Sequence, residues 1–360
     1  MLQGSHILLY FKLSNNSIIT KPTRSHMKKS ITTLSLCIIC LTVHQSFAQS
    51  NKSADLKFWE WIVTPYNTIS DQSYNLTIDM IHADAQNKAN LVNGIEQLNQ
   101  MTVATLKMYE NLPSDMLPEY DKLRTSAAIS IKTMRVVLDL DNLTSKVQSI
   151  PVLSSREILE RMRQSAELSK RLDSLDGSFQ NTLATFAKAR NIKLLSGDTA
   201  TANEKKRVGD VLNFSTALYK MYLETMMPFE DFTKLLSLED SSIALIKTRE
   251  ALRTAITEKK KQYKSLEISK PKDALLLEMD TFLNSMIDFS GTPIDAIIIY
   301  LKTPKDDRTI KMGRDYNLAI NAYNTELVPA INNFSLKMQE YKQKNIPPRK
   351  TKYKVVSSED

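Results

Sequence analysis

Cysteine and histidine, two residue types that often perform nucleophilic or metal chemistry, are scarce in this sequence. Both cysteines, Cys37 and Cys40, and three of the four histidines lie within the first 48 residues. If that segment is removed, His82 is the one imidazole that remains. A disulfide, a thiolate nucleophile, a Cys-ligated metal and a two-histidine metal site are then excluded. Any Ser-His-acid triad would have to use His82.

Acidic residues are missing from those first 48 residues, which contain five basic residues. From Met27 the chain has two lysines, then an apolar stretch, then small residues at the −3 and −1 positions of a cleavage site before Gln49. This layout is typical of a secretory signal peptide, and the apolar stretch is shorter than the roughly 20 residues of a membrane span. We predict a signal peptide at 27–48 and a misassigned upstream extension at 1–26. An N-terminal membrane anchor is the alternative.

The excess of positive charge belongs mostly to the same leader. Removing the leader lowers the formal net charge from +8 to about +3. A nucleic-acid interface needs basic residues clustered on one face, and so small an excess does not indicate one. The segment 347–360 is predicted to be a disordered basic tail, which is either simply solvated or weakly attracted to an anionic envelope surface. The basic residues of the tail are Arg349, Lys350, Lys352 and Lys354.

Alternating strand patterns and hairpin turns are also missing. Apolar residues recur instead at steps of three and four, as in the segments 91–112, 116–138 and 158–186. Glycine is rare, with seven residues in the chain, and this suits long helices because few turns then need a positive φ. The sequence therefore predicts an all-α protein.

The second half of the chain repeats the pattern of the first half. The segments 61–66 and 224–229 align around Pro65 and Pro228, and we expect a matched kink there in the first helix of each half. The alignment indicates an internal duplication, and a chance alignment of prolines is the alternative.

Each half is long enough for an antiparallel four-helix bundle with short connections. We therefore predict two tandem antiparallel four-helix bundles, the first at 49–195 and the second at 207–346. The segment 196–206 is small, polar and without periodicity, which is typical of a linker.

Candidate catalytic groups are few, and each has a simpler explanation. Asp79 and His82 are one helical turn apart, but a di-iron site needs a second histidine, so a hydrogen-bonded or exposed histidine is the preferred interpretation. A glycosidase would need two carboxylates across a cleft, but the acidic pairs are interpreted as solvated helix faces. No Gly-rich phosphate loop occurs, and we predict no cofactor or metal. The acidic pairs are Asp139 with Asp141, Asp173 with Asp176, and Asp306 with Asp307.

The densest aromatic cluster lies at 58–62 and occupies two faces of one helix. Core packing explains most of it, but a helix that is apolar on two sides also suits contact with a partner. Methionines and aromatics at the matched place in the second half would give adaptable apolar contacts. The candidate binding residues are Trp59, Trp61, Tyr66, Met226, Met227 and Phe229.

Two segments, 172–179 and 186–194, resemble the closing helix of a family of uncharacterised bacterial secreted helical surface proteins. The resemblance is carried by a Phe-Ala-Lys core followed by Asn-Ile and an aliphatic residue. It implies an exported helical protein and transfers no activity or site residue.

These observations predict an exported, non-catalytic protein of the bacterial envelope, in the periplasm or at the cell surface. It would bind an envelope protein or polymer through a surface or the groove between its two bundles. Two alternatives remain open: a carboxylate-dependent hydrolase assisted by His82, and a spacer whose only task is its shape.

Overall fold

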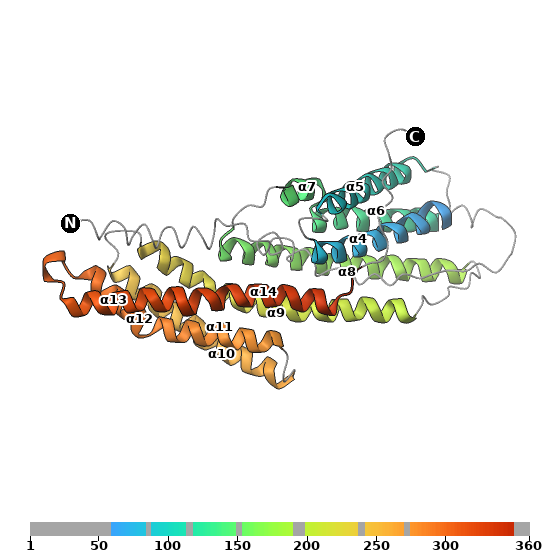
Figure 1. Cartoon of the computed structure of the whole chain (residues 1–360). Helices are drawn as coiled ribbons and strands as arrows, with labels where there is room; N and C mark the ends of the chain where they lie inside the picture. Colours follow the sequence, from blue (N-terminus) through green and yellow to red (C-terminus); the bar gives the residue numbers. More distant parts are fainter. Residues whose placement is uncertain are drawn as a thin grey trace. The chain divides into compact units, whose positions relative to one another are not determined.

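The computed structural model describes residues 59–83, 88–112, 118–148, 153–189, 199–236, 242–269 and 274–348. Every regular element in these ranges is helical, so the predicted all-α class is confirmed (Figure 1). The predicted signal peptide and the basic residues of the predicted tail lie outside the described residues.

In the described part of the first half, a π-helical turn is followed by α-helices. Asp139 alone separates two of these helices, and its φ of 49° places it in the left-handed region where a helix ends. The elements are η2 (Trp59–Val63), α4 (Thr64–His82), α5 (Lys88–Glu110), α6 (Pro118–Leu138), α7 (Leu140–Gln148) and α8 (Ser155–Ala189).

The second half has a comparable order of elements, with its third predicted helix also broken, here at Gly291. The duplication itself stays a prediction. The elements are α9 (Thr199–Leu236), α10 (Ser242–Ser269), α11 (Ala274–Ser290), α12 (Thr292–Lys302), the short 3-10 turn η3 (Lys305–Asp307), α13 (Ile310–Ala322), the π-helical turn η4 (Tyr323–Leu327) and α14 (Val328–Asn345).

Contacts divide the chain into two compact units, and the division differs from the predicted halves. The N-unit holds α4 to α7, α8 from Arg161, α9 up to Asn213, and the end of α14 from Lys342. The C-unit holds the start of α8, α9 from Phe214, α10 to α13, and the rest of α14. The arrangement as two tandem bundles therefore stays a prediction.

The predicted linker at 196–206 needs a correction, because α9 begins at Thr199 and is helical from there onward. Alanine, glutamate and lysine at 202–206 all favour helix, and this local preference outweighs the missing apolar periodicity. The bundle boundary at 207 falls inside the same helix.

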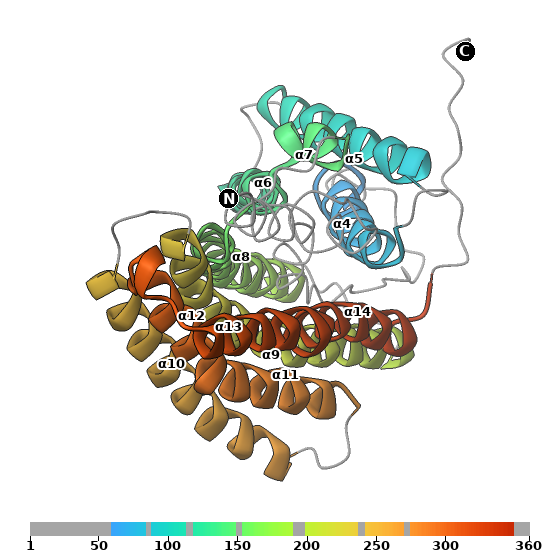
Figure 2. The ribbon, with the colours of Figure 1, turned by 60° about the vertical axis from the view of Figure 1, so that its left-hand side comes forward.

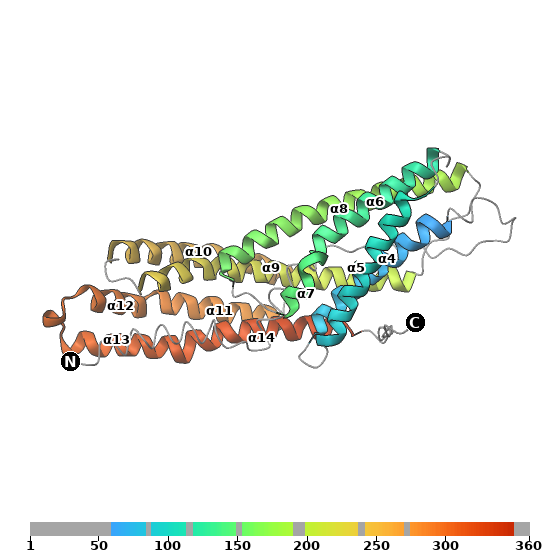
Figure 3. The same ribbon diagram turned by 90° about the horizontal axis from the view of Figure 1, so that it is seen from above.

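Aromatic side chains from several helices pack together in the core of the C-unit. Tyr222 on α9 packs against Phe282 on α11 and Phe334 on α14, with ring centroids 4.9 and 5.0 Å away. Helices α9 and α14 accordingly lie side by side (Figure 1 and Figure 2). Helices α11 and α12 run along α13 and α14 (Figure 3).

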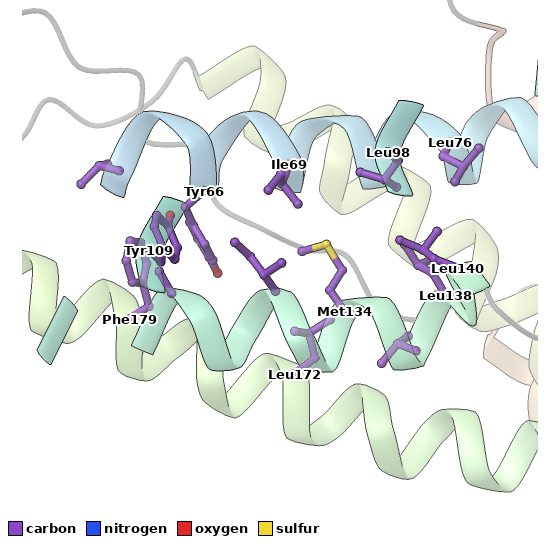
Figure 4. Packing of buried hydrophobic residues seen from close by; sticks show 14 of the residues in the cluster. Tyr66, Ile69, Leu76, Leu98, Tyr109, Met134, Leu138, Leu140, Leu172 and Phe179 are labelled. Carbon is purple, nitrogen blue, oxygen red and sulfur yellow. The ribbon is translucent and has the colours of Figure 1, made fainter. Parts of the chain in front are cut away.

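The core of the N-unit is formed by the apolar faces of α4, α5, α6, α7 and α8. At one end of this core, Tyr66, Tyr109 and Phe179 lie together (Figure 4). At the other end, Leu76 and Leu140 close the space between the helices (Figure 4). The end with the aromatic side chains positions the candidate site described below.

Two of the prolines follow π-helical turns in the same register. Pro65 is the second residue of α4 after η2, and Pro329 is the second residue of α14 after η4. Proline has no N–H and its ring clashes with the carbonyl four residues earlier, and a wider π turn accommodates that clash. The expected match was with Pro228, which instead lies inside α9 without a π turn.

Candidate functional site

The π-helical turn η2 presents an aromatic side chain on a fixed base. Ile62 and Val63 are completely buried, and the Tyr109 hydroxyl on α5 donates a hydrogen bond to the Ile62 carbonyl oxygen at 2.7 Å. Trp61 lies between the exposed Glu60 and the buried Ile62, and 36% of its surface is exposed. The backbone under Trp61 is thus anchored in the core while part of its indole reaches solvent.

Tyr66, one helical turn further along, has a different role. Its side chain is 1% exposed, its ring lies 4.1 Å from that of Phe179 on α8, and its hydroxyl donates a hydrogen bond to the Asp176 carboxylate. Tyr66 therefore joins α4 to α8 inside the N-unit. The sequence-based prediction of Tyr66 as a contact residue for a partner does not agree with this burial.

The matched residues on α9 also lie in a core. Met226 and Phe229 are 7% and 3% exposed, and Phe229 packs beside Phe289 and Tyr323 with ring centroids 6.2 and 6.3 Å away. Met227 is half-buried. Burial of Met226 and Phe229 disagrees with their prediction as surface contacts, because the periodicity that marks a binding face also marks a core face.

Trp59 is the remaining candidate, and its side chain lies outside the described residues. Among the candidates whose side chains are described, Trp61 has the largest exposed apolar surface. It is thus the residue on which a binding site can be built.

Tyr66, Asp176 and Lys205 form a polar network inside the N-unit, which the sequence did not predict. Asp176 is partly buried, and burial raises the pKa of its carboxyl above the ordinary range. The hydrogen bond from Tyr66 and the positive charge of Lys205 oppose this effect and lower that pKa. The pair Asp173–Asp176 was expected on a solvated face; Asp173 is exposed, but Asp176 joins an interior network.

Lys205 on α9 is almost completely buried, although it is a lysine. Its ammonium lies 3.0 Å from the Asp71 carboxylate on α4 and 5.2 Å from the centroid of the Tyr74 ring. One signal was present in the sequence, because Lys205 shares a helical face with the buried Val208 and Leu212. A buried lysine needs a counter-charge, and Asp71 supplies one.

The other acidic pairs have structural roles or are exposed. Asp139 accepts a hydrogen bond from the Asn142 side chain at 3.0 Å, and Asp141 forms an ion pair with Arg135. Asp306 and Asp307 are exposed in η3.

His82 ends α4 and is hydrogen-bonded, as the sequence analysis preferred. Its Nε2 atom lies 2.6 Å from the Ile346 carbonyl oxygen, so it acts as the donor to that oxygen. The Gln343 amide donates a longer hydrogen bond of 3.4 Å to the Ile81 carbonyl. Both interactions use the end of α14 that belongs to the N-unit.

Lys342, on that same end of α14, is a further residue that the sequence analysis did not single out. It is 2% exposed, and burial lowers the pKa of its ammonium group from 10.5 to about 7. Within the described ranges, no ion pair joins Lys342 to another residue.

The described residues offer neither a metal site nor a membrane-spanning helix. They contain no group of three or more histidine, cysteine, aspartate or glutamate side chains placed to hold a metal ion. None of the described helices combines the length and apolar character that crossing a bilayer requires. Comparisons with family models, with curated proteins and with solved structures give no significant match.

Proposed function

We propose that this is an exported, non-catalytic helical protein of the bacterial envelope, in the periplasm or at the cell surface, that binds a partner through the surface around Trp61. Export rests on the leader pattern at 27–48. The partner would be an envelope protein or polymer, with the basic residues of the tail adding attraction to an anionic surface.

The observation that carries the binding role is the contrast between Trp61 and its neighbours. A tryptophan that is 36% exposed beside two completely buried residues is held on a backbone that cannot easily turn it inward. Tryptophan contributes more binding free energy at interfaces than most residues because it buries a large amphipathic ring. The backbone under Trp61 is already ordered, so binding costs little backbone conformational entropy there.

The experiment compares capture by three immobilised proteins: the unaltered chain, Trp61→Ala and Leu318→Ala. Leu318 on α13 is a matched control, because it is an exposed apolar residue, with 58% of its surface accessible, in the C-unit. We expect a species from envelope extract to bind saturably to the unaltered chain and to Leu318→Ala. Trp61→Ala should weaken that binding by about tenfold or more.

Unfolding in urea separates binding from folding. Trp61→Ala should change the unfolding midpoint only slightly, because the side chain is partly exposed. If Trp61→Ala melts the N-unit, Trp61 is a core residue and the proposed site is wrong. If none of the three proteins retains a saturable ligand, a spacer role replaces the binding role.

A further inference from the structure

The connection between α12 and α13 lies at one end of the C-unit helices (Figure 3). It contains both basic residues and exposed apolar residues. We call residues 299–314 the tip. Between 302 and 314 every third residue is basic, and only Asp306 and Asp307 oppose them. The basic residues are Lys302, Lys305, Arg308, Lys311 and Arg314.

Three of these basic side chains are available for an outside partner. Lys302, Lys305 and Arg314 are exposed, and none forms an ion pair within the part of the chain that the structure describes. Lys311 differs, because its ammonium lies 2.6 Å from the Asp315 carboxylate. The tip therefore presents uncompensated positive charge.

Two isoleucines are exposed beside these charges. Ile310, the first residue of α13, is 95% exposed, and Ile299 on α12 is 50% exposed. A single exposed apolar residue is ordinary on a protein surface. Two isoleucines among unpaired cations form a surface that is apolar and positive together, as interfacial membrane-binding elements are.

The backbone that carries Ile310 is well fixed. The Thr309 side chain caps α13 by accepting a hydrogen bond from the Met312 N–H at 3.2 Å. Arg308 donates from Nε to the Thr303 carbonyl at 2.9 Å, and its guanidinium lies 4.3 Å from the Tyr300 ring centroid. The exposure of Ile310 is therefore a feature of an ordered turn.

We propose that the tip docks on an anionic lipid surface, with Ile310 entering the headgroup region and Lys302, Lys305 and Arg314 contacting lipid phosphates. Charge complementarity selects an anionic partner. The isoleucines select a lipid over an anionic polymer, because a polymer of sugars or nucleotides offers little apolar volume to bury them. This inference is independent of the Trp61 site, which lies in the N-unit.

The test is co-sedimentation of the purified protein with vesicles. One set is phosphatidylcholine alone, and the other contains about one third phosphatidylglycerol. The variants are Ile310→Ser, the double variant Lys302→Glu with Lys305→Glu, and Ile243→Ser. Ile243 on α10 is the matched control, because it is an isoleucine of the same unit with 84% of its surface exposed, outside the tip.

We expect the unaltered protein to bind the anionic vesicles in a salt-sensitive manner and to bind phosphatidylcholine far less. Ile310→Ser should weaken binding by about tenfold, and the double charge variant by about tenfold or more. Ile243→Ser should leave binding unchanged. Equal unfolding midpoints in urea would show that all variants are folded.

Three outcomes would overturn the proposal. The first is equal binding, or none, to the two kinds of vesicle. The second is an equal effect of Ile310→Ser and Ile243→Ser. The third is loss of binding in the charge variant alone, with dextran sulfate competing fully, because that result assigns the tip to an anionic polymer.

Discussion

The hydroxyl of Tyr66 on α4 donates a hydrogen bond to the carboxylate of Asp176 on α8, although 110 positions separate the two residues in the sequence. This bond stabilises the charged form of a carboxylate that burial would otherwise favour as neutral. The positive charge of Lys205 on α9 also favours the charged form of this carboxylate. The partly buried Asp176 on α8 therefore interacts with residues of two other helices of the N-unit, α4 and α9.

Asp176→Asn should change how stability depends on pH. The folded-state pKa of Asp176 is raised, so its contribution to stability is fully present below the unfolded-state pKa and is lost as the pH rises through the folded-state pKa. An asparagine never ionises. Relative to the unaltered chain, the variant should therefore gain unfolding free energy on going from acid to neutral pH.

Urea unfolding followed by circular dichroism between pH 3.5 and 7 measures this difference. Asp210→Asn is the control, because Asp210 is an exposed acid that pairs with Lys206 one turn away on α9. The difference in unfolding free energy between Asp210→Asn and the unaltered chain should not show the gain toward neutral pH that is expected for Asp176→Asn. A curve for Asp176→Asn that parallels the control would contradict the raised pKa.

Tyr66→Phe should remove the hydrogen bond and keep the packing. The ring can still lie against Phe179, so the expected cost is the bond to a charged acceptor, about 1.5–3 kcal/mol near neutral pH. A double-mutant cycle with Asp176→Ala, which removes the acceptor that an asparagine would keep, isolates the pair. If the two losses simply add, the hydroxyl and the carboxylate do not interact.

Lys342→Met should stabilise the protein near neutral pH. The folded-state pKa of Lys342 is lowered to about 7, so between pH 7 and 9 the folded chain binds fewer protons than the unfolded chain. Stability of the unaltered chain therefore rises with pH over this window. The stability of Lys342→Met lacks this dependence on pH. At pH 7 the unfolding free energy of the variant should exceed that of the unaltered chain by on the order of 1 kcal/mol. This difference should shrink toward pH 9.

The measurement is the difference in unfolding free energy between each variant and the unaltered chain across that window. Lys206→Met serves as the control. The Lys206 side chain is 74% exposed, so removal of its charge relieves no desolvation and should not stabilise the folded chain. A difference for Lys342→Met that does not vary with pH would mean that Lys342 stays protonated in the folded chain.

The sequence was sufficient for the helices, because a spacing of three and four depends only on local geometry. It was insufficient for the network around Asp176, since helical spacing alone does not reveal which helix will face it. The same limit explains why Tyr66 and Phe229 were predicted as binding residues although they are buried. An apolar helix face has the same sequence pattern whether it packs against another helix or binds a partner. The prediction of a linker fails from Thr199 onward for a different reason, because the helix propensity of the alanine, glutamate and lysine residues at 202–206 outweighs the missing apolar periodicity.

His82→Ala tests both the role of the histidine and the alternative of a hydrolase. Removing the ring leaves the Ile346 carbonyl oxygen without the Nε2 donor that lies 2.6 Å away. Ile346 is completely buried, so water does not easily replace this donor. We expect a loss of about 1 kcal/mol in unfolding free energy and faster amide hydrogen exchange at residues 342–346, with exchange in α5 and α6 little changed. His82→Gln, which can still donate to the carbonyl, should recover part of the protection. Any hydrolysis of envelope material by the unaltered chain that disappears in His82→Ala would reverse the non-catalytic proposal. Unchanged amide exchange at residues 342–346 would mean that the histidine does not hold this segment.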